Sequence, residues 1–129
     1  MKNTIFLMLL ALSLQGFAQM DPGVYTSNET WYVNWTDEGL ENHGDLVDEE
    51  PFFIEVRDHG FRIYNKEGDS GSMYSAMYVT ERNGWDIYSV YPDEKIEYKD
   101  GHFVWFYDFN YDTGYYKNSQ EFRNVTKVK

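Results

Sequence analysis

The sequence predicts an all-β fold, a single antiparallel meander of about eight strands. Three observations carry this prediction. Apolar and polar residues alternate along most of the chain after residue 50, and turn-forming residues interrupt this pattern at regular intervals. No window has the three-and-four spacing of an amphipathic helix. A sheet of about eight strands can close into a small barrel and remove its exposed edges, so we expect a barrel, with a β-sandwich as the alternative.

The first strands are expected before residue 36. Residues 30–35 alternate so that Trp31, Val33 and Trp35 share one face, and a short piece at 23–26 can precede them. The stretch 37–50 that follows is predicted to be one long loop, because it holds seven carboxylates and no Lys or Arg. Such a loop is either a solvated connection or a functional element, a docking surface or a lid over a barrel mouth.

The later strands are separated by recognisable turns. Asn83-Gly84 and Asp100-Gly101 are typical two-residue hairpin turns, because both positions tolerate positive φ. The strands expected around these turns are 52–56, 61–65, 73–80, 85–91, 95–99, 102–109 and 120–128.

The N-terminus has the three-part layout of a secretory signal peptide. One charged residue, Lys2, precedes an apolar run over 5–14, and the small residues Gly16 and Ala18 follow it. The run is too short to span a membrane. We therefore expect residues 1–18 to be a cleaved leader and 19–129 to be one domain, secreted or periplasmic.

Composition limits the partners. The chain has a net charge of −11, and removing the leader, which holds one Lys and no acid, makes it −12. Nucleic acid and anionic membranes are therefore unsuitable partners, whereas a basic protein, a cation or a neutral ligand fits the charge. There is no Cys, so no disulfide can form, and aromatic residues make up 19% of the chain. Stability must come from burial of these rings.

The layout resembles that of the lipocalin-like (calycin) barrels. A Trp-bearing early strand is followed by one long loop, by short-turned hairpins and by a last strand with Arg123. The resemblance implies that Trp31 or Trp35 stacks with Arg123, a cation–π contact. The Gly-x-Trp signature of the family is replaced by Gly23-Val24-Tyr25, and there is no room for the C-terminal helix of full lipocalins. Separately, the stretch 70–74 resembles the Ser/Gly-rich motif of barrel-shaped lysozyme inhibitors, but no residue role is carried over from it.

No catalytic motif is present, and we predict that the protein is not an enzyme and uses no cofactor. There is no Cys nucleophile, no Gly-x-Ser-x-Gly elbow and no phosphate loop. His43, His59 and His102 lack a metal-ligand spacing. The segment 108–114 has oxygen ligands at alternate positions, as calcium loops have, but its glycine and its twelfth position do not match. We interpret it as a strand end and predict no metal site.

The aromatic residues are the main candidates for binding. Several strands carry apolar side chains on both faces, so one face fills the interior and the other is covered or binds a ligand. Three interpretations remain open: a barrel holding a small apolar molecule, an exposed row of rings that stacks on sugars, and a packed core without ligand. For a ligand inside the barrel, the predicted lining residues are Trp31, Trp35, Met77, Trp85, Phe103 and Trp105. The alternatives are a carbohydrate-binding β-sandwich and an acidic inhibitor of a basic protein such as a lysozyme.

Overall fold

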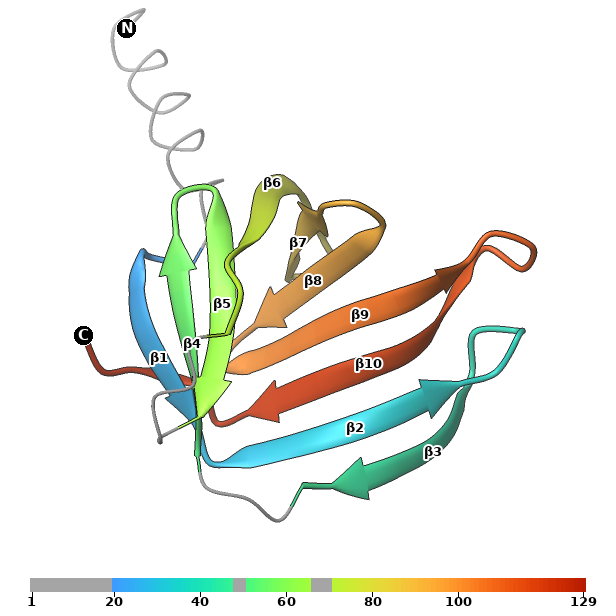
Figure 1. Cartoon of the computed structure of the whole chain (residues 1–129), viewed down its shortest axis with the longest axis horizontal. Coiled ribbons are helices and arrows are strands. Elements are labelled where there is room, and N and C mark those ends of the chain that lie inside the picture. The colour runs from blue at the N-terminus through green and yellow to red at the C-terminus, as the bar shows by residue number, and fades with distance from the viewer. Residues whose placement is uncertain (1–19, 48–50, 66–70) are drawn as a thin grey trace, which may run out of the picture.

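The all-β prediction is confirmed. A computed structural model describes residues 20–47, 51–65 and 71–129, and the predicted leader lies outside these ranges. The described residues form one antiparallel sheet of eleven strands and no helix (Figure 1). The described residues include no helix that is long and apolar enough to cross a membrane. The strands are β1 (Gly23–Ser27), β2 (Glu29–Trp35), β3 (Glu41–Leu46), β4 (Phe52–Arg57), β5 (Gly60–Asn65), β6 (Tyr74–Arg82), β7 (Trp85–Val90), β8 (Glu94–Lys99), β9 (His102–Asn110), β10 (Tyr115–Arg123) and β11 (Thr126–Lys127).

The sheet is not closed into a barrel, so that part of the prediction is wrong. Strands β4 to β10 form the expected meander, but β1 pairs with β4 and β11, whereas β2 pairs with β10 and β3. Only Asn28 separates β1 from β2 along the chain. Residues 23–35 therefore contribute one strand near each end of the sheet. The chain is continuous between β1 and β2, but these two strands do not pair with each other.

Both predicted hairpin turns are confirmed. Asn83 and Gly84 have φ of 56° and 85°, and Asp100 and Gly101 have φ of 47° and 81°. Positive φ at both central residues gives the turn a twist that matches the flanking strands. These turns fix the registers of β6 with β7 and of β8 with β9.

Two strand predictions need correction. The stretch 37–50 is not one loop, because Glu41–Leu46 forms β3 and pairs with β2. The residues of β3 have little β-propensity, so their sequence does not predict a strand. The strand forms because its backbone pairs with that of β2. Strand β10 starts at Tyr115 and not at residue 120, and Asn124 with φ of 54° ends the pairing before β11.

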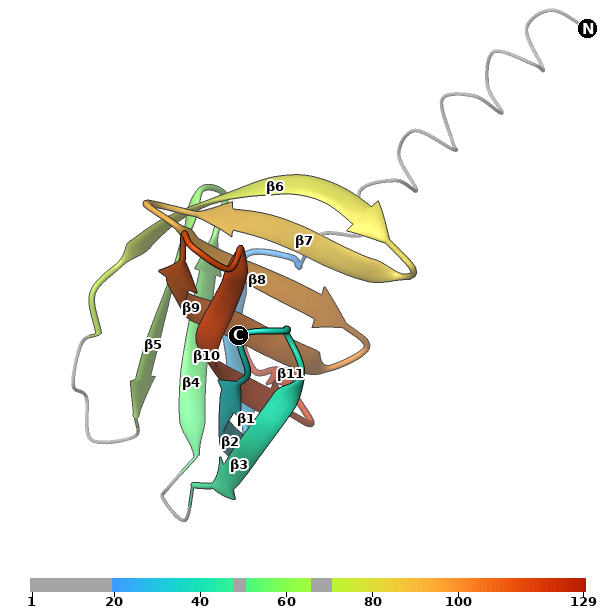
Figure 2. The ribbon, with the colours of Figure 1, turned by 90° about the vertical axis from the view of Figure 1, so that its right-hand side faces the viewer.

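The core lies between the two halves of the bent sheet, one built on β1, β4 and β5 and the other on β6 to β10 (Figure 2). Aromatic rings interlock across it: Phe61 of β5 contacts Phe103 and Trp105 of β9, and Phe52 of β4 contacts Phe122 of β10. The buried core residues are Met20, Tyr25, Ile54, Phe61, Ala76, Val90, Ile96, Phe103, Phe122 and Val125.

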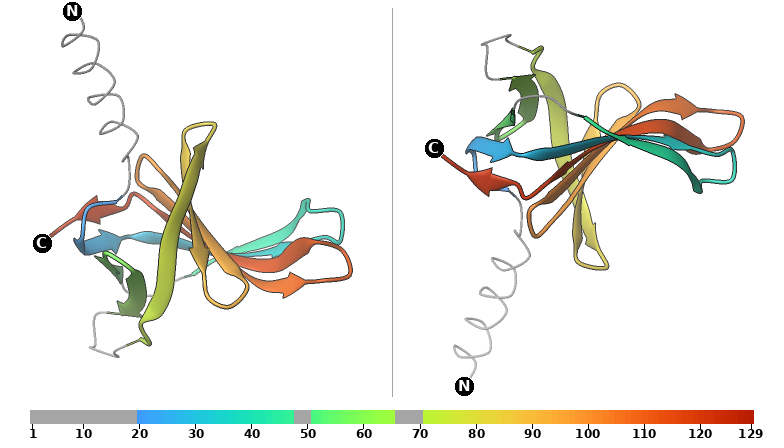
Figure 3. Two further views of the ribbon diagram at one scale, coloured as in Figure 1. Left: turned by 90° about the horizontal axis from the view of Figure 1, so that it is seen from above. Right: turned by 90° about the horizontal axis from the view of Figure 1, so that it is seen from below.

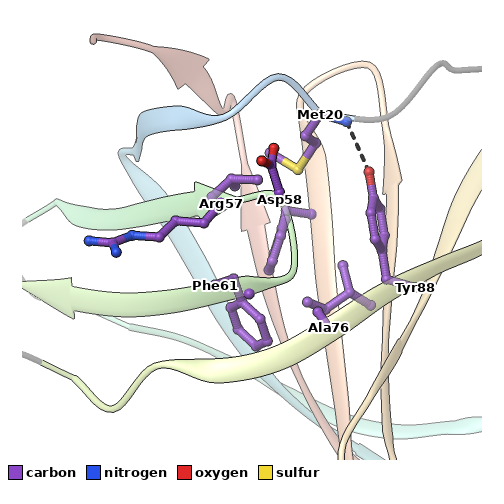
Figure 4. A pocket seen from close by; sticks show the side chains of 10 residues that line it. Met20, Arg57, Asp58, Phe61, Ala76 and Tyr88 are labelled. Carbon is purple, nitrogen blue, oxygen red and sulfur yellow. Dashed lines mark hydrogen bonds between the residues drawn. The ribbon is translucent and has the colours of Figure 1, made fainter.

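One cavity at the end of the core is small. The cavity beside Met20, Phe61, Ala76 and Tyr88 has a volume of about 20 Å³, which is room for a single water molecule (Figure 4). The backbone N–H of Met20 donates a hydrogen bond to the Tyr88 hydroxyl at 2.9 Å and holds the Met20 side chain at the end of the core.

The opposite face of β2, β9 and β10 carries a second set of apolar side chains. Val33 and Val104 are buried there, and the Trp35 ring packs on Phe106 with centroids 5.8 Å apart. The Trp35 indole N–H donates to the fully buried Ser119 hydroxyl at 2.9 Å. The prediction that several strands are apolar on both faces is therefore correct, and the outer face is largely covered by its own rings.

Two hairpins project from the core as one arm. The β2–β3 and β9–β10 hairpins run side by side away from β1, β4 and β5 (Figures 1 and 3). Strand β3 is its outer edge and carries mainly exposed polar side chains, which disfavour pairing with the edge of another molecule.

Candidate functional site

The most promising site is the face of the arm that continues from the core, here called the arm face. The strand register places its residues in two rows that cross β9, β10, β2 and β3. The first row is Trp105, Gln120, Tyr32 and Asp45, and the second is Tyr107, Asn118, Asn34 and His43. Directly opposite residues on neighbouring strands are close enough to interact. Rings and amides thus stand beside one another across four strands.

A chain of hydrogen bonds orders the second row. The Asn34 side-chain amide donates to the Asn118 carbonyl oxygen at 2.5 Å, and the Asn118 amide donates to the Asp108 carboxylate at 2.6 Å. Asp108 has φ of 57°, and the ladder between β9 and β10 skips this position. This irregularity brings the Asp108 carboxylate onto the same face as its neighbour Tyr107. The three side chains hold each other in fixed orientations at the surface.

Aromatic rings border the arm face where it meets the core. The Trp105 ring contacts Tyr107 and Tyr74, with centroids 5.3 and 5.1 Å apart. The indole N–H of Trp105 donates to the Glu94 carboxylate of β8 at 2.8 Å. Across β10, Tyr32 is 44% exposed. The face therefore has a rigid aromatic border on one side and an accessible tyrosine on the other.

The electrostatics of the arm face reflect partial burial. Burial raises the pKa of Glu94, the hydrogen bond from Trp105 opposes this, and the negative charge of Asp108 raises it further. Burial also raises the pKa of Tyr107, and the neighbouring Tyr32 and Asp108 add to that shift. At neutral pH the Tyr107 hydroxyl is therefore a neutral hydrogen-bond donor and acceptor.

The structure does not bring the six predicted lining residues together. Phe103 is 1% exposed inside the core, and Trp105 lies at the rim of the core beside the arm face. Trp31, Trp35 and Trp85 lie on the outer face, where Trp85 contacts His102. Met77 is 66% exposed on β6. Period-two alternation finds which residues share a face within a strand, but it does not say which faces of different strands join.

A second hollow lies on the outer face of the arm. It has a volume of about 240 Å³ and is lined by four rings, one glycine and one lysine: Trp35, Phe106, Tyr115, Tyr116, Gly39 and Lys95. The Lys95 ammonium lies 4.8 Å from the centre of the Phe106 ring and 3.0 Å from a Glu97 carboxylate oxygen. Of the predicted lining residues, Trp35 belongs to this hollow.

Metal ligands do not converge in the described ranges. No group of three His, Asp or Glu side chains there could hold a metal ion, and this includes segment 108–114. In that segment Asp108 bonds to Asn118, and the Asn110 carbonyl oxygen of the side chain accepts from the backbone N–H of Asp112. These oxygens serve the hairpin itself. His43 bonds to Asp45 at 2.8 Å on the arm face.

The sequence did not predict that the amides of Asn34 and Asn118 would lie side by side on the arm face. Asn34 and Asn118 are 84 residues apart, and only the pairing of β2 with β10 makes them neighbours. The available signal was indirect: if Trp31, Val33 and Trp35 share one face, Tyr32 and Asn34 must share the other.

Comparisons with known proteins identified no relative. Searches of protein-family models, curated proteins and solved structures each found no match.

Proposed function

We propose that this chain is an exported, non-catalytic carbohydrate-binding protein that binds through the arm face. The observation that carries the proposal is the pair of cross-strand rows, which place the rings of Tyr107 and Tyr32 beside two amides, Asn118 and Asn34, that are held in a hydrogen-bond chain. The predicted leader supports the location outside the cytoplasm. The proposed activity is recognition.

The chemistry of the rows suits sugars. A pyranose has apolar faces made of C–H groups and a rim of hydroxyls that both donate and accept hydrogen bonds. Tyr32 and Tyr107 offer ring surface for the apolar faces. A side-chain amide has two N–H donors and an oxygen with two lone pairs, so Asn34 and Asn118 keep donor and acceptor capacity beyond the bonds that they make to each other and to Asp108.

Preorganisation favours binding at this face. Asn118 is already fixed by bonds to both Asn34 and Asp108. Side chains that are ordered before the ligand arrives lose less conformational entropy on binding. The same bond fixes the position of the Asp108 carboxylate beside Asn118.

A small apolar ligand is the second candidate function, and it suits the outer hollow better than the core. The core cavity of about 20 Å³ has room for one water, whereas the hollow of about 240 Å³ is walled by Trp35, Phe106 and Tyr116. A lipocalin-like relationship remains a proposal that rests on the layout and on the contact of Trp31 with Arg123. A basic protein as partner also remains a proposal, and it rests on the net charge of −11.

The experiment measures binding of soluble oligosaccharides and polysaccharides by calorimetry and affinity electrophoresis. Asn118→Ala is expected to weaken binding of the responding sugar about tenfold, because it removes ligand bonds and releases Asn34 and Asp108. Asn28→Ala is the matched control, because Asn28 accepts a comparable exposed bond from Asn124 at 3.3 Å away from the arm. Equal losses in both variants, or no sugar bound by the wild type, contradict the proposal.

A further inference from the structure

The charged side chains of the arm face are a guide to the class of glycan. Three carboxylates border the rows: Glu94 at the aromatic end, Asp108 beside Asn118, and Asp45 opposite Tyr32. The imidazole of His43 is hydrogen-bonded to the Asp45 carboxylate. The electrostatic potential over the arm face is therefore dominated by negative carboxylate charges.

Two lysines, Lys95 and Lys117, lie near the arm, and they do not balance the negative charge of these carboxylates. Lys95 of β8 lies on the opposite face, where its ammonium sits over the Phe106 ring and pairs with Glu97. Lys117 lines the open hollow at the β9–β10 tip together with Asp108 and Asp112, so one cation stands there against two carboxylates. Among the described residues, carboxylates thus outnumber cations around the arm face, so an anionic ligand there would meet net repulsion.

The rows also indicate the direction in which a bound chain would lie. They run across the strands, from β9 through β10 and β2 to β3. Neighbouring strands are about 4.8 Å apart, so each row covers about 14 Å. This length exceeds one sugar ring. Gln120 of the first row is buried, so the second row, Tyr107, Asn118, Asn34 and His43, is the one that suits an extended chain crossing the strands.

From these observations we infer that the ligand is a neutral, extended glycan lying across β9, β10, β2 and β3, and that glycans carrying carboxylates or sulfates are excluded. The inference rests on the proposed carbohydrate-binding function and specifies its ligand. Neutral hydroxyls donate hydrogen bonds to Asp108 and Asp45, whereas a uronate meets like charge at short range.

The test compares neutral polysaccharides (glucan, mannan and xylan) with anionic ones (polygalacturonate and alginate) in affinity electrophoresis of the full mature chain. At least one neutral glycan is expected to bind, with anionic glycans at least about tenfold weaker. Asp45→Asn combined with Asp108→Asn keeps hydrogen-bonding groups and removes two charges. This double variant is expected to raise the ratio of anionic to neutral affinity about tenfold, because it removes the like charge that an anionic glycan meets.

Asp58→Asn, in the exposed turn between β4 and β5, removes one charge away from the arm and serves as the control. Added salt is expected to weaken the exclusion of anionic glycans and to leave neutral binding unchanged, because it screens exposed charges. Anionic glycans bound as tightly as neutral ones overturn the inference and leave the proposed function standing. No glycan of either class bound overturns the proposed function and the inference with it. A double variant whose ratio of anionic to neutral affinity equals that of the wild type also overturns the inference, because the carboxylates are then not the cause of the exclusion.

Discussion

The Arg123 guanidinium lies over the Trp31 ring, 5.3 Å from its centre, and joins β10 to β2 on the outer face. The Glu29 carboxylate holds both partners: it accepts from the Trp31 indole N–H at 2.9 Å and from Arg123 at 3.4 Å. Glu121 contacts the second guanidinium nitrogen at 3.2 Å. The contact of Arg123 with Trp31 was one of the pairings implied by the resemblance to lipocalin-like barrels.

Replacing Arg123 is expected to destabilise the fold moderately. Arg123→Ala loses the ring contact and two partly exposed ion pairs, which together contribute about 1–2 kcal/mol to the free energy of unfolding. Arg123→Lys keeps the charge without the planar group and should lose about half as much. Urea unfolding measures both, with exposed Arg82→Ala as the control. An Arg123→Ala variant as stable as the wild type contradicts the structural role.

Asp86 makes stability depend on pH. It is 4% exposed, and one of its carboxylate oxygens has no hydrogen-bond partner within the described part of the chain. Burial, and secondarily Glu81, raises the pKa of Asp86 from 3.8 to about 6. The folded state therefore binds the proton more tightly than the unfolded state. The contribution of this group to stability increases as pH falls from above 6 towards 4, and is lost as pH rises through 6.

Asp86→Asn tests this linkage. At pH 8 the variant is expected to be more stable than the wild type by up to about 3 kcal/mol, because the buried charge is gone. Near pH 4 the two should be equal. Chemical denaturation at several pH values measures the difference, and Glu81→Gln should give a smaller effect of the same sign. A destabilised Asp86→Asn at pH 8 would show that the carboxylate has a favourable ionic partner.

Two glycines with the same backbone angle allow a matched comparison. Gly39 and Gly114 both have φ of 78°, at the tips of the two arm hairpins. A Cβ at Gly39 would lie 2.5 Å from the Tyr115 ring, whereas a Cβ at Gly114 would meet nothing within 4 Å. Gly114→Ala is expected to cost about 1–2 kcal/mol from backbone strain alone. Gly39→Ala should cost more, because Tyr115 must also move. Thermal unfolding measures both, and equal costs would mean that the Tyr115 contact contributes nothing.

Ligand length provides a test of the cross-strand direction. If a glycan crosses all four strands of the arm, affinity should rise with each added sugar until the chain covers about 14 Å, and then remain constant. Calorimetry with a series of oligosaccharides of the responding glycan measures this. Tyr32→Ala should remove the gain from the later sugars and leave the shortest ligand unaffected, whereas Tyr111→Ala at the hairpin tip should change neither. Affinity independent of length would limit the site to one ring.

The sequence was sufficient to predict the elements whose cause is local. Asn83-Gly84 and Asp100-Gly101 readily adopt the positive φ that a two-residue hairpin turn requires, and the alternation around Ile54 marks a face that is buried in the structure. Strand β3 escaped prediction because its pairing comes from β2. The arm face escaped because it is formed by register, and residues such as Asn34 and Asn118 have no individual signature. The predicted closure of the sheet into a barrel was wrong because the number of strands alone does not decide which strands pair at the ends of a sheet.

The one-residue junction at Asn28 also constrains the order of folding. Residues 23–27 pair with β4, which follows soon in the chain, but residues 29–35 pair with β10, more than eighty positions later. The Ser27 hydroxyl joins both sides by donating to the Arg123 carbonyl at 2.7 Å. Long-range pairing of this kind forms slowly. Strand β1 can therefore pair with β4 early, whereas the pairing of β2 with β10 can form only after residues up to Arg123 have been synthesised.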